Sequence, residues 1–332
     1  MAMQTERHAN ASPDLSIVTV NYDTGELLLR CLRSVHASTR EVRFECIVVD
    51  NASRERRSLE RVREGFPQVR LLENAENLGF AAGCNVGLDV ARGRYLLLLN
   101  PDATVGTHVL DRMVAFLDSR PQAAVLGSPL VYPDGRDQGV AGRGFPTPLA
   151  FLFGRTTLLT RWFPHNRISA RFSAKRDASR TEPYEVDWVS GACMMVRKRA
   201  IDEVGALDPG FFFMWEDADW CFRMKAVGWK VYCSHEAGVV HVEAGSRDRG
   251  YRILWLTTVA FHRGAYRYYR KHISPRGGDP SHLLVICALA VRALLLLLAR
   301  SIKRLGDQLA GRSPGPGAAG LDDGSLDPRV AE

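Results

Sequence analysis

Acidic side chains at two places in the sequence could take part in catalysis. Asp102 follows the apolar stretch 95–99 after a short Asn-Pro turn, and Glu216 and Asp217 follow the five large apolar residues 211–215. A carboxylate held by a rigid turn is suited to a divalent cation such as Mg²⁺, which prefers oxygen ligands. A carboxyl group beside large apolar side chains loses hydration, which raises its pKa toward the range of a general base. The sequence therefore offers a candidate metal ligand and a candidate base.

Each of these residues also has a structural interpretation, which the sequence alone leaves open. Asp102 could cap the helix that follows it, and acids in the first turn of a helix interact favourably with the helix dipole. Asp217 and Asp219 lie about 200° apart around a helix, so only one of them can face a substrate. His241, at the end of a predicted strand, is either a metal ligand or an ordinary buried or surface histidine.

The elements that would hold these residues follow from apolar patterning. Apolar runs predict strands at 15–22, 44–50, within 69–80, at 94–105, at 123–132, after 186 and up to His241. Helical spacing predicts helices at 26–38, 54–66, 81–93 with Gly93 at its end, 111–120, before 205 and up to Gly228. This alternation predicts an α/β fold with a Rossmann-like, mostly parallel sheet and helices on both faces. Ligands bind beyond the carboxyl ends of such strands, so Asp50 and Asp102 should open onto one crevice.

Glycines spaced by four residues mark the helix predicted at 81–93. Gly79, Gly83 and Gly87 give it a face without side chains, which favours close packing, while Asn77 and Asn85 stay available for a ligand. The segment does not match G-x-G-x-x-G, and the chain has no G-x-x-x-x-G-K-[ST]. We therefore expect neither a nicotinamide dinucleotide site nor a P-loop.

Composition limits the class of protein and its partners. A chain of 332 residues with 46% hydrophobic content can bury a core of enzyme size. Its formal net charge of +7, from 44 basic and 37 acidic residues, favours phosphate-bearing partners or an anionic membrane surface. The seven cysteines form no C-x-x-C pair, so we expect reduced cytoplasmic thiols and no zinc site. The first fourteen residues lack the apolar segment of a secretory signal, which also favours the cytoplasm.

Changes in composition divide the chain. We expect a disordered tail at 1–13, one α/β domain at 14–245 with an insertion at 133–184, a helical region at 246–306 and a disordered tail at 307–332. The insertion is rich in Gly, Pro and Arg. No internal repeat is visible.

The helical region at 246–306 has features of a membrane surface. Residues 283–299 are apolar but shorter than the roughly 20 residues of a spanning helix, and Arg292 interrupts them. Its cations, Arg292, Arg300, Lys303 and Arg304, fall within about 120° of a helical wheel, so we expect an interfacial or partly inserted helix rather than a spanning one. Aromatic and basic residues alternate in 251–276, which suits the level of lipid headgroups or, alternatively, a solvated helix packed on the domain.

Six motifs in one order resemble those of glycosyltransferase family 2, in its rhamnosyltransferase-like branch. They are SIVTVNY, VVDNAS, ENLGFAAGCNVG, LLLLNPDATV, VDWVSGACMMVRK and FFFMWEDADWCFRMKAVGW followed by VVH, within residues 14–245. The resemblance implies the GT-A fold and an inverting transfer. In such a transfer, an acceptor hydroxyl attacks the anomeric carbon of a sugar as the nucleoside diphosphate leaves.

The resemblance also implies roles on the donor side. Asp50 corresponds to the acid that contacts the nucleoside base, and Asn77, Gly79 and Asn85 correspond to the loop and helix around the nucleotide. Asp102 corresponds to the last acid of the family's D-x-D motif, which ties a Mg²⁺ or Mn²⁺ ion to the donor diphosphate. Asn100 replaces the first acid of that motif, so it remains a donor-site residue, but we expect weaker metal binding.

The remaining roles concern the reaction itself. Asp217 corresponds to the catalytic base, Glu216 to its partner, and His241 to a histidine that completes the metal shell. The implied activity is transfer of a sugar, in this branch rhamnose from dTDP-rhamnose, to a saccharide or polyprenyl-diphosphate-linked acceptor in cell-surface polysaccharide synthesis. Together with the helical region, this predicts a peripheral enzyme on the inner face of the cell membrane.

Two other functions remain compatible with the predicted fold. A sugar nucleotidyltransferase would need a Gly-rich basic loop near the first strand, where VNYDTGELLLR supplies one glycine and Arg30. A non-catalytic carbohydrate-binding or scaffold protein would be expected to lack the acids, which are present. We expect no nucleic-acid partner, because the cations lie beside apolar segments and no nucleic-acid motif occurs.

Overall fold

The computed structural model describes residues 12–139, 142–147, 179–236, 238–243, 251–276 and 279–309. The tail predicted at 1–13 lies outside these residues except for its last two positions. The central part of the insertion predicted at 133–184 also lies outside them, as does the tail predicted at 307–332 except for its first three residues, which are helical.

In the described residues, the main sheet has eight strands in the order β3-β2-β1-β4-β9-β6-β10-β8. All are mutually parallel except β9, which is antiparallel to β4 and β6, and β8, which is antiparallel to β10. The sheet is therefore mostly parallel, as predicted. Its strands are β1 (Leu15–Asn21), β2 (Phe44–Asp50), β3 (Arg70–Glu73), β4 (Tyr95–Leu99), β6 (Ala123–Gly127), β8 (Tyr184–Val186), β9 (Cys193–Arg197) and β10 (Lys230–Cys233).

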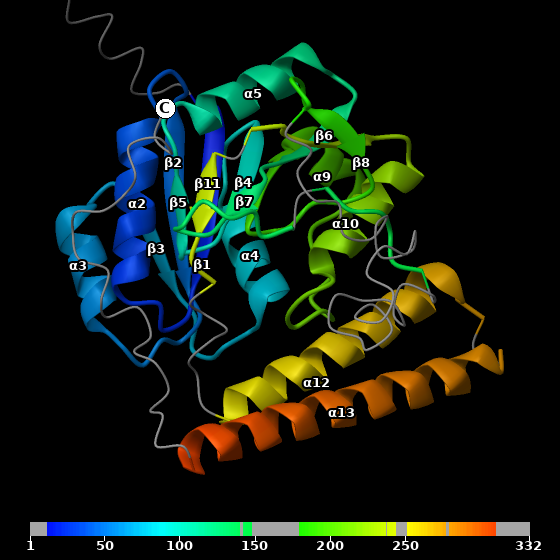
Figure 1. Ribbon diagram of the computed structural model, residues 1–332. Helices are drawn as coiled ribbons and strands as arrows, with labels where there is room; N and C mark the ends of the chain where they lie inside the picture. The colour runs from blue at the N-terminus through cyan, green and yellow to red at the C-terminus, as the bar shows by residue number, and fades with distance from the viewer. Residues whose placement is uncertain are drawn as a thin grey trace, which may run out of the picture.

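Helices cover both faces of this sheet (Figure 1). Because side chains alternate along a strand, Ile17 and Leu97 pack with α2, α3 and α5, whereas Val18 and Leu98 pack with α4, α9 and α10. This confirms the predicted layers. The helices are α2 (Glu26–Ser38), α3 (Arg57–Gly65), α4 (Phe80–Leu88), α5 (Val109–Ser119), α9 (Lys198–Val204) and α10 (Glu216–Ala226).

A second, three-stranded sheet was not expected from the sequence. It has the order β5-β11-β7, with β5 (Ala103–Val105), β7 (Leu130–Val131) and β11 (Val239–His241). The single strands predicted at 94–105 and 123–132 were therefore wrong, because each divides between the two sheets. Pro101 lies in the first break, where it removes a backbone donor from the ladder.

The helix predicted at 81–93 ends earlier, at Leu88. Gly93 is not its end. A Cβ atom at Gly93 would lie 2.5 Å from the backbone nitrogen of Ser16, so glycine is needed there for the close approach of two backbones. The predicted close packing of the glycine face is confirmed, since a Cβ at Gly87 would lie 2.4 Å from Val18 Cγ1 on β1.

Two long helices follow the α/β domain and lie antiparallel, side by side, along its lower side in Figure 1. They are α12 (Tyr251–Tyr268), which continues into the π-helical turn η1 (Tyr269–Ile273), and α13 (Ser281–Leu309). Arg292 of α13 does not face outward: its Nη1 donates to His262 Nε2 of α12 at 2.9 Å. The arginine that interrupts the apolar sequence is thereby accommodated between the helices.

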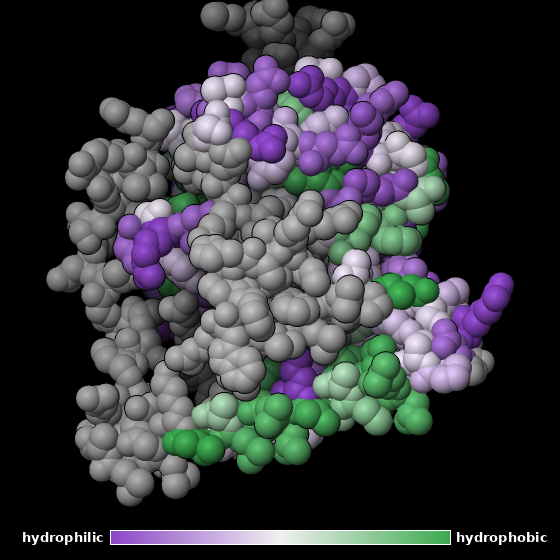
Figure 2. Space-filling model, turned by 45° about the vertical axis from the view of Figure 1, so that its right-hand side comes forward, coloured by the Kyte–Doolittle hydropathy of each residue, from purple (hydrophilic) through white to green (hydrophobic). Residues whose placement is uncertain are grey.

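The outer side of α13 is apolar. Figure 2 shows a hydrophobic band along this helix. Among the described residues, the segment Ser281–Ala299 is the one helix long and apolar enough to cross a membrane by length and composition. The exposed apolar side chains on α13 include Leu283, Leu284, Leu294, Leu295 and Leu298.

Candidate active site

The carboxyl ends of β1 and β2 lie level, because Asn21 and Asp50 are register partners. Asp50 is buried, and its Oδ1 accepts hydrogen bonds from Asn21 Nδ2 at 2.7 Å and from Ser53 Oγ at 2.5 Å. Its Oδ2 accepts from the Ser53 backbone at 3.0 Å. The strand therefore places Asp50 where the sequence predicted, with its carboxylate held in a polar network.

The loop before α4 joins this edge through Asn51. The Asn51 amide nitrogen donates to Gly79 O at 2.9 Å, and Asn77 Oδ1 accepts from Gly79 N at 2.9 Å. Gly79 has a φ of 85°, and a Cβ there would lie 2.5 Å from Phe212 O. Asn77 and Gly79 thus form a fixed loop next to the end of β2, in contact with the segment that precedes α10.

Asn85 lies apart from this loop contact. Its side chain donates to Leu207 O at 2.8 Å and accepts from Leu207 N at 3.1 Å. The amide therefore holds the segment between α9 and α10 against α4. Direct contact between Asn85 and a ligand stays a prediction.

The structure brings Asn100, Asp102 and His241 together. The second sheet pairs His241 with Ala103, so the histidine lies beside Asp102 although the two residues are far apart in sequence. His241 Nε2 is 3.1 Å from Asp102 Oδ1 and 3.2 Å from Asn100 Nδ2. Three residues predicted separately thus form one cluster after the break that Pro101 makes.

Gln138 orients the histidine of this cluster, and sequence reasoning missed it. Its Nε2 donates to His241 O at 2.5 Å, which leaves Gln138 Oε1 to accept from His241 Nδ1 at 3.0 Å. The Nδ1 proton leaves the lone pair on Nε2, directed toward Asp102. No local motif marks Gln138, because the contact joins residues 103 positions apart.

Two atoms of this cluster could hold a divalent cation: Asp102 Oδ1 and His241 Nε2, which face each other at 3.1 Å. An imidazole fixed through its other nitrogen is the arrangement seen in metal-ligating histidines. The described residues contain no group of three or more His, Cys, Asp or Glu side chains that could hold a metal ion. A cation held by Asp102 and His241 would therefore take its remaining ligands from a bound diphosphate or water.

Glu216 and Asp217 begin α10, as predicted. Burial raises the pKa of Asp217, against the lowering effect of the N–H groups of Gly191 and Ala218. Burial and the adjacent Asp217 charge raise the pKa of Glu216 well above the ordinary carboxyl value. Glu216 Oε2 is buried without a hydrogen-bond partner in the described part of the chain. The pair has the raised pKa values expected of a proton-transfer site.

A short segment before β9 joins the acid pair to the Asn100 cluster. Gly191 N donates to Asp217 Oδ2 at 3.1 Å, and the next residue, Ala192, accepts through its carbonyl from Asn100 N at 3.0 Å. The two groups of candidate residues therefore lie on either side of residues 191 and 192. They form one candidate site.

Asp219 does not share this site. It is fully buried and paired with Arg223, Lys271 and His272. Asp219 is therefore turned into this ion-pair cluster, and that Asp217 faces a substrate stays a prediction.

Comparisons with known proteins agree with this arrangement. The family model described as glycosyl transferase family 2 matches residues 16–205. An N-acetylglucosaminyl-diphospho-decaprenol L-rhamnosyltransferase of Mycobacterium tuberculosis is 28% identical over 316 residues, which cover 90% of this chain and 98% of that protein. The O-antigen biosynthesis protein RfbC of Myxococcus xanthus is 26% identical over 290 residues, or 81% of this chain and 20% of that protein.

Among solved structures, a crystal structure of GalNAc-T7 with UDP, GalNAc and Mn²⁺ matches with a TM-score of 0.53 and 16% identity. It covers 84% of this chain and 55% of that chain. This likeness shows the GT-A fold. The match to the family model extends over more than half of the sequence, and the rhamnosyltransferase relative aligns along nearly all of it. The chain belongs to glycosyltransferase family 2, in its rhamnosyltransferase-like branch.

Proposed function

We propose that this enzyme transfers rhamnose from dTDP-rhamnose to a hydroxyl group of a polyprenyl-diphosphate-linked saccharide, with inversion at the anomeric carbon. The observation that carries the proposal is the convergence of two groups, Asn100–Asp102–His241 and Glu216–Asp217, on either side of residues 191 and 192. The first group suits a diphosphate with its cation, and the second suits an attacking hydroxyl. The name of the Mycobacterium tuberculosis relative supports the sugar and the class of acceptor.

The donor half binds and orients the nucleotide sugar. Asp50 with the loop Asn77–Gly79 borders the nucleoside, and Asp102 with His241 would hold Mg²⁺ or Mn²⁺ at the diphosphate. When bound, the cation neutralises charge on the departing diphosphate. Gln138 Oε1 accepts from Nδ1 of His241 and fixes its imidazole, so the Nε2 ligand atom is oriented in advance.

Asp217 is the general base of the proposed reaction. It takes the proton of the acceptor hydroxyl while the acceptor oxygen forms a bond to the anomeric carbon and the carbon–oxygen bond to the diphosphate breaks. The raised pKa of Asp217 makes its carboxylate a stronger proton acceptor. The charge on Asp217 in turn raises the pKa of Glu216 beside it.

The membrane is the proposed location of the acceptor. The exposed leucines of α13 form an apolar surface, and Arg292 is turned inward to His262. Such a helix can lie in the interfacial layer or insert partly. We propose that the enzyme is peripheral on the cytoplasmic face, in cell-surface polysaccharide synthesis, where a polyprenyl diphosphate would present its sugar to the site.

Donor binding and transfer test the proposal in turn. Thermal-shift binding of dTDP-rhamnose and a panel of UDP-sugars, each with and without Mn²⁺, should show metal-dependent stabilisation by one donor that Asp102→Ala loses. Mass spectrometry should then detect one added deoxyhexose on polyprenyl-diphosphate N-acetylglucosamine in vesicles. Stabilisation by a UDP-sugar alone would refute the proposed donor. Transfer to a free saccharide but not to the lipid-linked one would refute the proposed acceptor.

A further inference from the structure

The turn that carries the candidate base is held on both sides by the C-terminal helices. Asp217 lies two residues after Trp215 and two before Asp219. Trp215 contacts α12, and Asp219 contacts η1. The family match ends at residue 205, so these contacts lie outside the region that the match describes.

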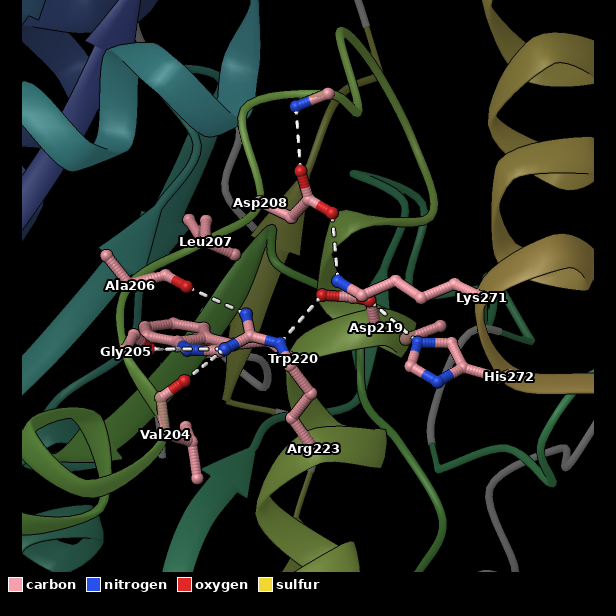
Figure 3. Close-up of polar contacts among 12 residues, drawn as sticks. Val204, Gly205, Ala206, Leu207, Asp208, Asp219, Trp220, Arg223, Lys271 and His272 are labelled. Carbon is pink, nitrogen blue, oxygen red and sulfur yellow. Dashed lines mark hydrogen bonds and ion pairs between the residues drawn. The ribbon is translucent and has the colours of Figure 1, made fainter. Parts of the chain in front are cut away.

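Asp219 is the centre of the first contact, shown in Figure 3. Its Oδ1 accepts from Lys271 Nζ at 2.6 Å and His272 Nε2 at 2.7 Å, and its Oδ2 accepts from Arg223 Nε at 2.9 Å. Burial acts to raise the pKa of Asp219, but the hydrogen bonds from His272 and Lys271 lower it below the ordinary value. A fully buried carboxylate is thus kept charged by two residues of the C-terminal region.

The same contacts reach the segment between α9 and α10. Arg223 donates from Nη1 to Val204 O at 2.6 Å and from Nη2 to Ala206 O at 2.7 Å, as Figure 3 also shows. Lys271 donates to Asp208 Oδ2 at 2.8 Å. The first turn of α10, the preceding segment and η1 are therefore one hydrogen-bonded unit.

Trp215 forms the contact on the other side of Asp217. Its Nε1 donates to Phe261 O of α12 at 2.9 Å. A Cβ atom at Gly264 would lie 2.7 Å from Trp215 Cδ1, so only glycine allows α12 to lie this close to the indole. Trp215 has a φ of 79°, a strained conformation for a residue with a side chain, which such contacts support.

We infer that α12 and η1 are a positioning element of the reaction centre, in which Lys271 and His272 act through Asp219 to hold Asp217 against the donor site. The inference rests on the proposed role of Asp217. The donor-side cluster, Asn100–Asp102–His241, is built by the two sheets and does not depend on η1. Loss of the Lys271 contact should therefore slow the chemical step and leave donor binding intact.

The experiment compares Lys271→Met with two other variants of the full-length chain in lipid vesicles. We expect Lys271→Met to lower kcat about tenfold with an unchanged KM for the donor, because a small displacement of a reacting group has effects of this size. Lys271→Arg should restore most of the activity. Lys225→Met is the matched control: it removes an ion pair to Asp187, at 2.9 Å, from the last turn of α10, the helix that carries Asp219. It should lower Tm and leave kcat unchanged once corrected for the folded fraction.

The variants at Lys271, Lys225 and Asp219 distinguish a positioning role from a purely structural one. Equal corrected kcat values for wild type and Lys271→Met, or equal losses in Lys271→Met and Lys225→Met, would overturn the positioning role. Asp219→Asn should repeat the Lys271→Met result; should it fail to fold, Lys271→Met decides alone, because that side chain is 33% exposed. If the wild type transfers no sugar, the proposed function is wrong, whereas an active wild type with unaffected variants overturns only this inference.

Discussion

The two halves of the active site are held by different kinds of interaction. The Asn100–Asp102–His241 cluster stands on backbone ladders, with β4 between β1 and β9 and β11 between β5 and β7. The first turn of α10 is held by side-chain contacts, since Asp219 and Trp215 bind residues of η1 and α12. A ladder tolerates the loss of one side chain, whereas a charged contact fails when one partner is removed.

This difference suits what each half binds. A nucleoside diphosphate is the same in every cycle, and a rigid sheet edge orients it without rearrangement. The acceptor is proposed to arrive from a membrane, and α12, which helps to hold the base, packs on α13, whose outer side is apolar. The half that meets the acceptor is thus mechanically joined to the surface from which the acceptor comes.

The largest effect should come from removing the base. Asp217→Asn is expected to lower kcat about 10³-fold, because it removes the proton acceptor and keeps the shape of the side chain. Donor binding should stay within twofold, as measured by thermal shift. Asp202→Asn, at an exposed acid of α9 paired with Lys198, is the control and should change neither kcat nor donor binding. Loss of donor binding in Asp217→Asn would show that the two halves are not separable.

The pH dependence of kcat in the wild type should next distinguish the base from the donor-binding half of the site. Burial raises the pKa of Asp217. A base must be deprotonated to act, so kcat should fall as pH decreases through that raised pKa, about tenfold per unit below it. Donor binding, measured by thermal shift at each pH, distinguishes loss of the base from loss of the donor. A midpoint near 4, the value of an ordinary carboxyl group, would contradict the assignment of Asp217 as the base.

The halves also differ in how far the sequence predicts them. Asp50, Asn100 and Asp102 follow apolar strands, and the ends of parallel strands meet at one edge whatever the details of packing. The partners Gln138 and His272 could not be found this way. Their contacts depend on a second sheet and on a helix added after the domain, and neither leaves a local pattern.

Gln138 offers a smaller test, confined to the donor half. Gln138→Leu frees Nδ1 of His241, and we expect Mn²⁺ affinity in the presence of dTDP to fall about tenfold, as measured by calorimetry. Gln68→Leu is matched, because Gln68 also contacts a histidine, His36, but at the surface. Equal Mn²⁺ affinity in both variants would mean that orientation of His241 is unimportant for metal binding.

A single substitution on the apolar side of α13 should weaken membrane binding by about tenfold, the same factor as expected for Mn²⁺ affinity. Leu295 is 57% exposed, and Leu295→Glu removes a side chain worth about 1.5 kcal/mol when buried in lipid, or roughly tenfold in partitioning. Flotation with anionic vesicles measures this change. Val227→Glu, at a 51% exposed residue at the end of α10, is the control and should float like the wild type. Equal flotation of all three proteins would contradict a membrane-facing α13.

The smallest predicted effect concerns the contact that joins the two halves. Gly79 and Gly135 both have positive φ angles, of 85° and 79°. A Cβ atom at Gly79 would lie 2.5 Å from Phe212 O, whereas a Cβ atom at Gly135 would have no atom within 4 Å. Both alanine variants bear the cost of the backbone conformation, so their difference measures the contact alone. Urea unfolding should show Gly79→Ala less stable than Gly135→Ala by at least about 1 kcal/mol. Because Phe212 precedes the turn that carries Asp217, Gly79→Ala should also lower kcat, and equal stability of the two variants would mean that the donor loop and the base are positioned independently.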